Sequence, residues 1–227
     1  MRYLRLIVVA LVAACAVGAT IADSGFALPT LLPETTKNWT GTTPFKNELW
    51  KLDGENKVTC NETTAEGTTE ASKPLGMFHI NFKRCELQGL QKCTGTGDEV
   101  GLILELGSWH LVYDTLGVNL AAAGVAVLLL VGALKFKCAG VAEFEIKAGG
   151  MVLCLIANPT TLTKTFEYNC TKASNERRPG ETKYYNAAGT LVSTSPLLAN
   201  ENGGAFGEIA QLGLGFMTFG EDVLIMV

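Results

Sequence analysis

The sequence predicts an all-β, disulfide-bonded protein folded as an antiparallel β-sandwich, a jelly roll or a barrel, with little helix beyond an N-terminal leader. Apolar and polar residues alternate with a period of two, and almost no window shows a helical stripe. Turn sequences rich in glycine and proline separate these stretches, and six cysteines follow the leader. Many short strands separated in this way are typical of sandwiches and barrels.

The leader has the layout of a secretory signal. Arg2 and Arg5 precede the apolar run 6–14, and small residues follow it. Cleavage motifs occur at 20–22 and 25–27, and the second is preferred. We therefore expect a signal peptide over 1–27 and a single secreted β domain over 28–227. As an alternative, residues 12–15 resemble a bacterial lipobox, in which Cys15 would carry a lipid anchor at the cell surface.

The charge balance argues against nucleic acid as a partner. The chain has 18 Lys and Arg against 22 Asp and Glu, and loss of the leader removes Arg2, Arg5 and Asp23. The remaining domain is mildly acidic, and its only adjacent arginines are Arg177 and Arg178. Because phosphate binding depends on clustered basic side chains, we expect no nucleic-acid partner.

The apolar run 116–134 must be weighed as a membrane span, since its length would suffice and Lys135 and Lys137 follow it directly. A span there would leave three of the six cysteines on each side, with an odd thiol in each compartment. Glycines also interrupt the run. We therefore expect its second half, 125–131, to form a short strand buried on both faces.

The alternation places the other strands in order along the chain. A last strand is expected near 222–227, after the apolar stretch 212–216. The polar stretches 61–73 and 172–183 are expected to be exposed loops. The apolar strand faces are Phe78, Ile80 and Phe82; Val100, Leu102, Leu104 and Leu106; Trp109, Leu111 and Tyr113; Leu134, Phe136 and Cys138; Phe144 and Ile146; and Phe166, Tyr168 and Cys170.

Six cysteines permit many pairings, and the strand pattern reduces their number. Cys85 and Cys93 flank a short segment with Gly89 at its middle, so a tight loop could join them. Cys154 and Cys170 lie on either side of a turn at 158–159, which suits facing positions in a hairpin. The remaining pair is then Cys60 with Cys138.

No cofactor or metal is expected. The sequence lacks the short paired spacings of zinc-binding cysteines, and its only histidines are His79 and His110. Each is out of phase with its apolar neighbours, so His79 is expected to face solvent on a strand.

We also expect no catalytic activity, because the chain has no nucleophile-elbow motif. The alternative is a secreted hydrolase that uses either a noncontiguous triad with a histidine or two paired carboxyl groups. Most of the acids alternate with apolar residues, which places them on a solvated outer face. The candidate acids are Glu105, Asp114, Glu143, Glu145, Glu221 and Asp222.

Aromatic residues favour a binding role. Trp39, Trp50, Tyr184 and Tyr185 lie in polar surroundings, where exposed rings could stack on sugars or anchor a protein surface. We therefore expect a structural or binding protein, with adhesion or carbohydrate contact as its role and an extracellular protein or glycan as its partner. Membrane contact is expected only through a lipid at Cys15 or a span near 116–134.

Three segments carry a resemblance to a known group. The segment 28–33, the closely spaced cysteines of 82–93 and the strand at 162–166 resemble secreted β-rich proteins of soil actinobacteria. The resemblance spans most of 28–227. That group has no assigned activity, substrate or cofactor, so the likeness implies an exported bacterial β protein and transfers no functional residue.

Overall fold

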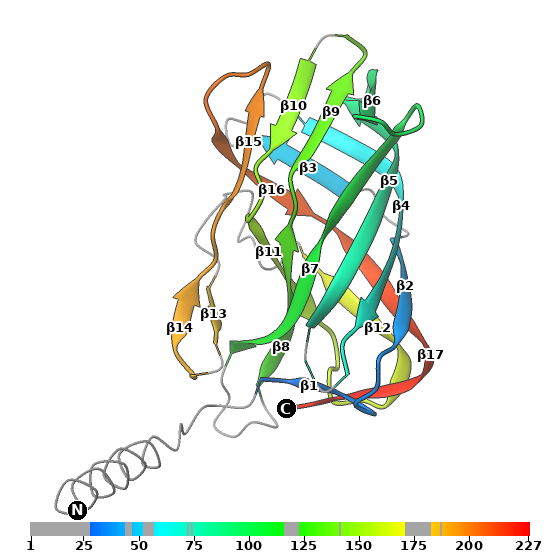
Figure 1. Cartoon of the computed structure of the whole chain (residues 1–227), viewed down its shortest axis with the longest axis vertical. Helices are drawn as coiled ribbons and strands as arrows, with labels where there is room; N and C mark the ends of the chain where they lie inside the picture. Colours follow the sequence, from blue (N-terminus) through cyan, green and yellow to red (C-terminus); the bar gives the residue numbers. More distant parts are fainter. Residues whose placement is uncertain are drawn as a thin grey trace, which may run out of the picture.

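The computed structural model describes residues 28–43, 47–51, 57–71, 73, 75–115, 123–140, 142–170, 183–186 and 188–227, and at 47–51 it describes the backbone alone. All regular secondary structure in these residues is β-strand (Figure 1). The described part of the chain contains no helix with the length and hydropathy of a membrane span. The strands are β1 (Thr30–Leu32), β2 (Asn38–Thr43), β3 (Asn47–Lys51), β4 (Lys57–Thr69), β5 (Leu75–Leu87), β6 (Gln91–Gly95), β7 (Leu102–Thr115), β8 (Gly124–Val131), β9 (Leu134–Cys138), β10 (Ala142–Ile146), β11 (Met151–Ile156), β12 (Thr163–Asn169), β13 (Lys183–Tyr185), β14 (Leu191–Ser193), β15 (Leu197–Glu201), β16 (Gly207–Leu212) and β17 (Leu214–Met226).

Strand pairing closes the sheet into a barrel. One ring runs in the order β2, β4, β5, β7, β8, β11, β12 and β17, and β17 pairs with β2 to complete it. Every pairing in it is antiparallel. The ring therefore joins strands from both ends of the described chain, and we call it the first ring. The predicted all-β antiparallel fold is confirmed, and the barrel is the form it takes.

Six of the remaining strands close a second ring with β4 and β5, above the first ring in Figure 1, and β1, β13 and β14 lie outside both rings. The order of the second ring is β3, β4, β5, β6, β9, β10, β15 and β16, with β16 pairing back to β3. The long strands β4 and β5 belong to both rings. Residues 57–60 of β4 pair with β3, and residues 63–68 pair with β2. The chain also passes between the rings where β8 of the first ring leads into β9 of the second, and where β16 of the second ring leads through Gly213 into β17 of the first.

The predicted alternation is confirmed in most strands. On β5, Phe78 and Phe82 are buried in the core whereas His79 between them is exposed. β8 is buried on both faces, as expected of residues 125–131. Its inward side chains join the main core, and its outward ones pack in a second cluster with residues of β7 and β11, against which Tyr184 of β13 lies. Tyr184 thus covers part of this outer apolar face.

Two boundary predictions are wrong. The stretch 61–69 is strand, because it completes β4 and pairs with β2 on one side and β5 on the other. Its threonines are β-branched, which suits a pleated strand, and Thr63 and Thr69 are buried. The second error concerns the C-terminus, where β17 continues without a break through 214–226. Residues 1–27, 116–122 and 171–182 lie outside the described residues, and with them the predicted leader, Cys15 and most of the loop 172–183.

All six cysteines after the leader form disulfides, and each bond joins directly opposite residues of adjacent chain segments. Cys154 pairs with Cys170, as predicted. The predicted Cys85–Cys93 and Cys60–Cys138 pairs are wrong: the bonds are Cys60–Cys85, between β4 and β5, and Cys93–Cys138, between β6 and β9. Three disulfides indicate folding in an oxidising, extracellular-type environment.

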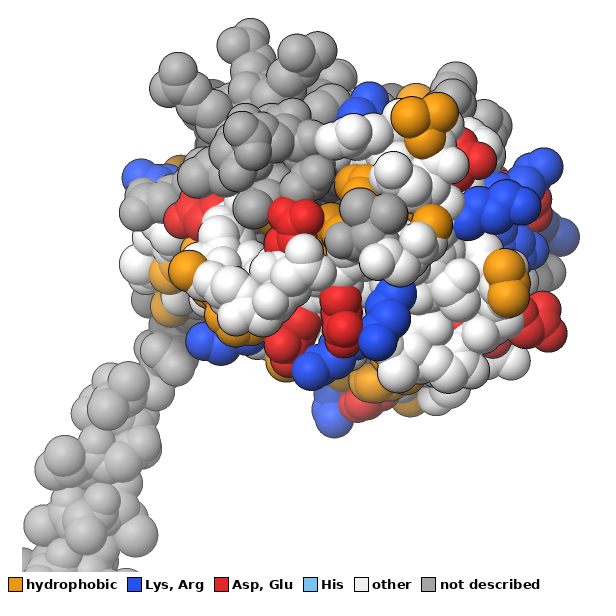
Figure 2. Space-filling view, turned by 90° about the horizontal axis from the view of Figure 1, so that it is seen from above, with side chains coloured by type: hydrophobic (Ala, Val, Ile, Leu, Met, Phe, Trp, Pro, Cys, Tyr) orange, Lys and Arg blue, Asp and Glu red, His pale blue; other side chains and the backbone are white. Residues whose placement is uncertain are grey.

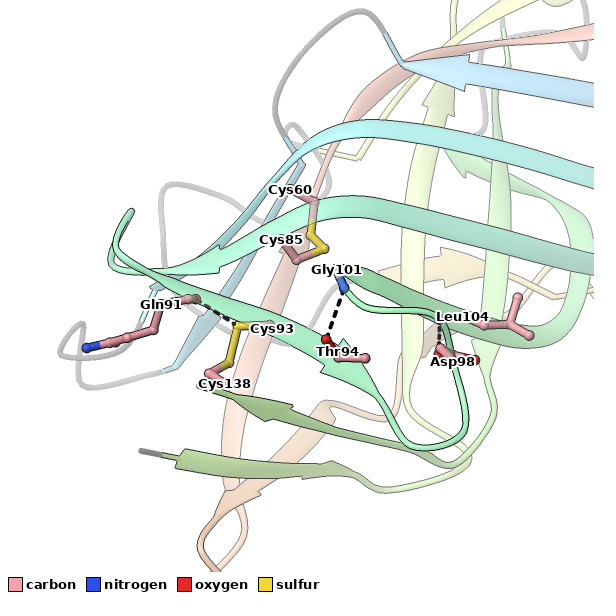
Figure 3. Close-up of a disulfide and its surroundings, with 9 residues drawn as sticks. All are labelled: Cys60, Cys85, Gln91, Cys93, Thr94, Asp98, Gly101, Leu104 and Cys138. Atoms are coloured by element: carbon pink, nitrogen blue, oxygen red, sulfur yellow. Dashed lines mark hydrogen bonds between the residues drawn. A yellow bond between two sulfur atoms is a disulfide. The ribbon is translucent and has the colours of Figure 1, made fainter. Parts of the chain in front are cut away.

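The connection between β6 and β7 lies beside these two disulfides (Figure 3). The Gly101 backbone N–H donates to Thr94 Oγ1 at 3.0 Å, and the Leu104 N–H donates to Asp98 Oδ2 at 2.9 Å. The side chain of Thr94 thus satisfies a backbone donor in the turn, and that of Asp98 satisfies one at the start of β7. They fix the course of the chain as it crosses from the second ring into β7.

Candidate functional site

An interior cavity occupies the first ring. Its volume is about 50 Å³, several times the ~10–15 Å³ that one water needs and about a third of the ~150 Å³ of an apolar cavity that holds benzene. All eight strands of the ring contribute to its wall, together with the end of β16. The lining residues are Trp39, Thr63, Ala65, Phe78, Ile80, Phe82, Trp109, Val127, Leu129, Cys154, Tyr168, Cys170, Gln211, Leu212, Gly213 and Met217.

The wall of the cavity is mainly aromatic and aliphatic. The indole N–H of Trp109 donates to the Thr68 carbonyl oxygen at 3.2 Å, whereas the indole N–H of Trp39 is buried without a protein partner. Burial raises the pKa of Tyr168 to about 12, so its hydroxyl stays neutral. An apolar wall with a few polar atoms is the usual composition of a small-molecule site.

Four of the aromatic rings in the wall lie opposite a glycine on the neighbouring strand. The pairs are Trp39 with Gly67, Trp109 with Gly76, Phe78 with Gly107, and Tyr168 with Gly215. A Cβ at Gly67 would overlap the Trp39 ring, and one at Gly107 would overlap the Phe78 ring. The glycines leave room for large rings to lie flat against the inner face of the barrel, a cross-strand pairing that stabilises glycine-containing strands.

Substitution of one of these glycines is expected to disturb the wall. A Cβ at Gly107 would overlap both the Leu130 carbonyl oxygen and the Phe78 ring. We expect Gly107→Ala to lower the free energy of unfolding by roughly 1–3 kcal/mol, the usual cost of overpacking. Gly207→Ala in β16 is the matched control, because a Cβ there meets no atom within 4 Å. Urea denaturation of both variants measures the difference, and equal stability would contradict it.

At the second-ring end of the first ring, a polar pair crosses the interior. Glu105 on β7 is fully buried, and Gln211 on β16 is nearly so. Gln211 Nε2 donates to Glu105 Oε1 at 3.5 Å. In the first ring β7 lies four strands away from β17, into which β16 leads, so this hydrogen bond joins opposite walls. Glu105 Oε2 and Gln211 Oε1 have no protein partner.

The position of Glu105 corrects a prediction. The apolar residues 100, 102, 104 and 106 were expected to form the buried face, with Glu105 on a solvated outer face. Instead Ile103 and Glu105 are fully buried, whereas Val100 and Leu106 are 86% and 47% exposed. Alternate residues of a strand share one face, and in β7 the face of Trp109, Leu111 and Tyr113 points inward. Glu105 lies on that same face, so it is buried with them. Desolvation raises the pKa of Glu105 to about 7, and the hydrogen bond from Gln211 opposes this only in part.

The other candidate acids have different partners. Glu143 and Glu145 on β10 form ion pairs with Lys137 and Lys135 on β9, at 3.2 and 3.1 Å. Glu221 pairs with the buried Lys37. Asp222 is exposed, and partial burial raises the pKa of Asp114. Because Glu105 bonds to an amide, these contacts give no support to the paired-carboxyl alternative.

The described acidic and basic side chains are interspersed on the second-ring end of the molecule, which is the face seen in Figure 2. The ion pairs between β9 and β10 are part of this mixed pattern.

The histidines lie on the barrel wall away from the Glu105–Gln211 pair. His79 is exposed on β5, with its Nδ1 3.7 Å from Glu66 Oε1. His110 is partly buried on β7, and burial lowers its pKa. Within the described residues, no three His, Cys, Asp or Glu side chains gather as metal ligands.

The predicted ligand-stacking aromatics do not form an exposed platform. Trp39 is 8% exposed and lines the interior cavity. Tyr184 and Tyr185 are half-buried: Tyr184 packs on the outer apolar cluster and Tyr185 on the main core. Trp50 lies on β3, but its side chain is outside the described residues. Of these residues, Trp39 is therefore the one whose ring is placed at the cavity.

The cavity itself was not predicted from the sequence. Its signal in the sequence is the pattern of glycines and aromatic rings at alternate positions, such as Phe78 and Gly76 on one strand and Trp109 and Gly107 on another. No family model matches the chain, and comparison with curated proteins and with solved structures gives no significant similarity.

Proposed function

We propose that this protein is an exported, non-catalytic binding protein that takes a small apolar molecule into the first ring. The observation that carries the proposal is the cavity itself, because every strand of a closed ring contributes to its wall and the lining is mostly hydrocarbon. An apolar cavity of this kind binds ligand by removing apolar surface from water.

The construction of the wall supports a preformed site. The rings of Trp39, Phe78 and Trp109 are fixed by cross-strand glycines, and Cys154–Cys170 joins two strand segments where its cysteines line the cavity. A rigid wall needs little ordering when ligand enters, which favours affinity. Export is proposed from the apolar leader together with the three disulfides. The predicted contact with glycans through exposed rings receives no such support.

Binding of xenon, a small apolar atom, tests the proposal. The xenon NMR shift should change with the oxidised protein and saturate as the xenon concentration rises, because dry apolar cavities bind xenon. Val127→Phe places a ring in the cavity, since Val127 lines it. This variant should bind xenon at least ~10-fold more weakly, since the apolar volume that accepts xenon is filled.

The control for this experiment is Leu106→Phe, which adds the same ring type on the exposed face of β7. It should leave xenon affinity unchanged. Near-ultraviolet circular dichroism of each variant establishes that the barrel is intact. Equal loss of xenon binding in both variants, or no saturable binding in the wild type, would refute an interior site.

A further inference from the structure

The Glu105–Gln211 pair satisfies its own hydrogen bonds when the carboxyl carries a proton. Gln211 Nε2 donates to Glu105 Oε1 at 3.5 Å, whereas Glu105 Oε2 and Gln211 Oε1 have no partner in the protein. A protonated carboxyl offers one O–H donor, and an amide oxygen accepts. A proton on Glu105 Oε2 therefore lets it donate to Gln211 Oε1, and two reciprocal hydrogen bonds then join the side chains. Both side chains are more than nine-tenths buried, where an unmade hydrogen bond is costly.

The surroundings of Glu105 favour this protonated form. The strands around it are β5, β6, β8 and β9 beside β7, and β16 across the barrel. Within the described residues, the buried side chains of these strands carry no charge. Asp98 accepts the Leu104 N–H, and its negative charge disfavours a second carboxylate close by. Burial thus raises the pKa of Glu105 to about 7, and the carboxyl is neutral in mildly acidic solution.

The other titrating groups lie away from the pair. Tyr168 in the cavity wall stays neutral, because burial raises its pKa to about 12. Lys37, which is the other buried charged side chain in the described part of the chain, pairs with Glu221. His79 and His110 lie on the outer face of the barrel, since each alternates with buried residues of its strand. Among the described groups inside the barrel, Glu105 is therefore the one whose charge changes near neutral pH.

The pair also joins two places where the chain passes between the rings. Next to Glu105, the Leu106 carbonyl oxygen accepts the N–H of Gly132, which lies between β8 and β9. Gln211 lies near the end of β16, which leads through Gly213 into β17. Gln211 and Gly213 are both part of the cavity wall. A change in the pair therefore acts directly on the wall of the cavity.

We propose that the Glu105–Gln211 pair is a pH-sensitive switch, which excludes water from the cavity while the carboxyl is protonated and draws water in when the carboxyl ionises. This inference rests on the binding function proposed above and names the regulation of that site. On ionisation the proton passes to the solvent, and Glu105 Oε2 becomes an acceptor like Gln211 Oε1. The two acceptors then need two donors, which one water supplies. Next to Gln211, the cavity offers several times the volume that one water needs.

Water in the cavity opposes the binding of an apolar ligand, because the ligand must displace the water and cannot replace its hydrogen bonds. Xenon should therefore bind roughly fivefold more weakly at pH 8.5 than at pH 5.5, which is the factor that one net hydrogen bond is worth. The coupling between proton and ligand is reciprocal, so xenon should in turn raise the pKa of Glu105.

Two measurements on the oxidised protein test the switch. Xenon NMR at pH 5.5 and pH 8.5 measures the change in affinity. Infrared spectroscopy follows the proton, since a protonated carboxyl has a C=O band that a carboxylate lacks. At pH 5.5 the wild type should show this band in excess of Glu105→Gln, and the excess should disappear by pH 8.5. Saturating xenon should shift its disappearance to higher pH, a readout that requires no xenon binding by a variant.

Variants separate the switch from the binding function on which it rests. Glu105→Gln keeps the pair without a titrating group, because two amides also form reciprocal hydrogen bonds. Its xenon affinity should be the same at both pH values, whereas Glu143→Gln on the outer face should keep the fall. Equal affinity at both pH values in the wild type, a retained fall in Glu105→Gln, or absence of the excess band would overturn the switch and leave the cavity as a binding site. No saturable xenon binding at either pH would overturn the binding function and the switch together.

Discussion

Removal of the Cys93–Cys138 disulfide is expected to lower the free energy of unfolding by about 4 kcal/mol. The bond joins cysteines 45 residues apart in the sequence, so it strongly restricts the unfolded chain. It also joins β6 to β9 within the second ring. We expect the double variant Cys93→Ala, Cys138→Ala to show this loss in urea denaturation, with circular dichroism reporting retained strand content in the absence of urea.

The Cys154–Cys170 bond supplies the comparison. Its cysteines are 16 residues apart, so chain entropy predicts a smaller loss, about 3 kcal/mol, for the matching double alanine variant. All four cysteines are buried, so the packing losses are similar. A larger loss for the shorter ring would contradict the entropic argument. Peptide mapping of the oxidised wild type should recover a Cys60–Cys85 cross-link, and a Cys85–Cys93 cross-link would contradict the structure.

The second large effect is a fall in stability as pH rises, caused by Glu105. Its carboxyl has a pKa of about 7 in the folded protein, against 4.5 for an unperturbed Glu. Below pH 4.5 both states hold the proton. Between these values the unfolded chain loses it first, so the free energy of unfolding decreases, and above pH 7 the loss is complete. The full difference is about 3 kcal/mol, at ~1.4 kcal/mol for each pKa unit.

Glu105→Gln isolates this contribution, because the amide has nearly the same shape and does not titrate. We expect the variant to be about 3 kcal/mol more stable than the wild type at pH 8 and equal to it near pH 4, as measured by urea denaturation across the pH range. Groups that titrate elsewhere, such as Glu145, cancel in the difference between the two proteins. A difference that does not change with pH would show that the carboxyl is not held in a desolvated site.

The sequence predicts the strands well where one face is apolar and the other polar. Phe78, Ile80 and Phe82 illustrate this, since each inward position is apolar and each position between is polar. It also predicts β8, because cysteine parity and interrupting glycines argue against a span at 116–134, and the apolar second half of that run suits a strand covered on both sides. The Cys154–Cys170 pair follows from a local turn, so nearby residues suffice to find it.

The other disulfides depend on contacts that local sequence does not determine. In the β5–β6 hairpin Glu86 faces Lys92, and one further step of this register would place Cys93 opposite Cys85. On its other side Cys85 faces Cys60. Cys85 thus has a candidate partner on each neighbouring strand, and the spacing of the cysteines favours the nearer one. Closure of the second ring brings β9 beside β6, so Cys93 faces Cys138 and Cys85 is left to bond with Cys60.

The candidate site was hidden for the same reason. Two alternating series run through β7 before Trp109, and the more apolar one, Leu102, Leu104 and Leu106, faces outward. Glu105 is seen to point inward only when the alternate buried positions are followed from Ile103 to Trp109. Gln211 lies more than one hundred positions later in the chain. Its meeting with Glu105 follows from barrel closure, which no local pattern encodes.

Closure also limits how one molecule can attach to another through its backbone. Every strand of either ring pairs with a neighbour on both sides, along all or part of its length, so most of its N–H and C=O groups are used within the molecule. Outside the rings, β1 and β14 pair on one side only, and each has three residues. Long, flat, unpaired margins are the usual starting points of intermolecular strand addition. Margins as short as those of β1 and β14 offer little template for such strand addition.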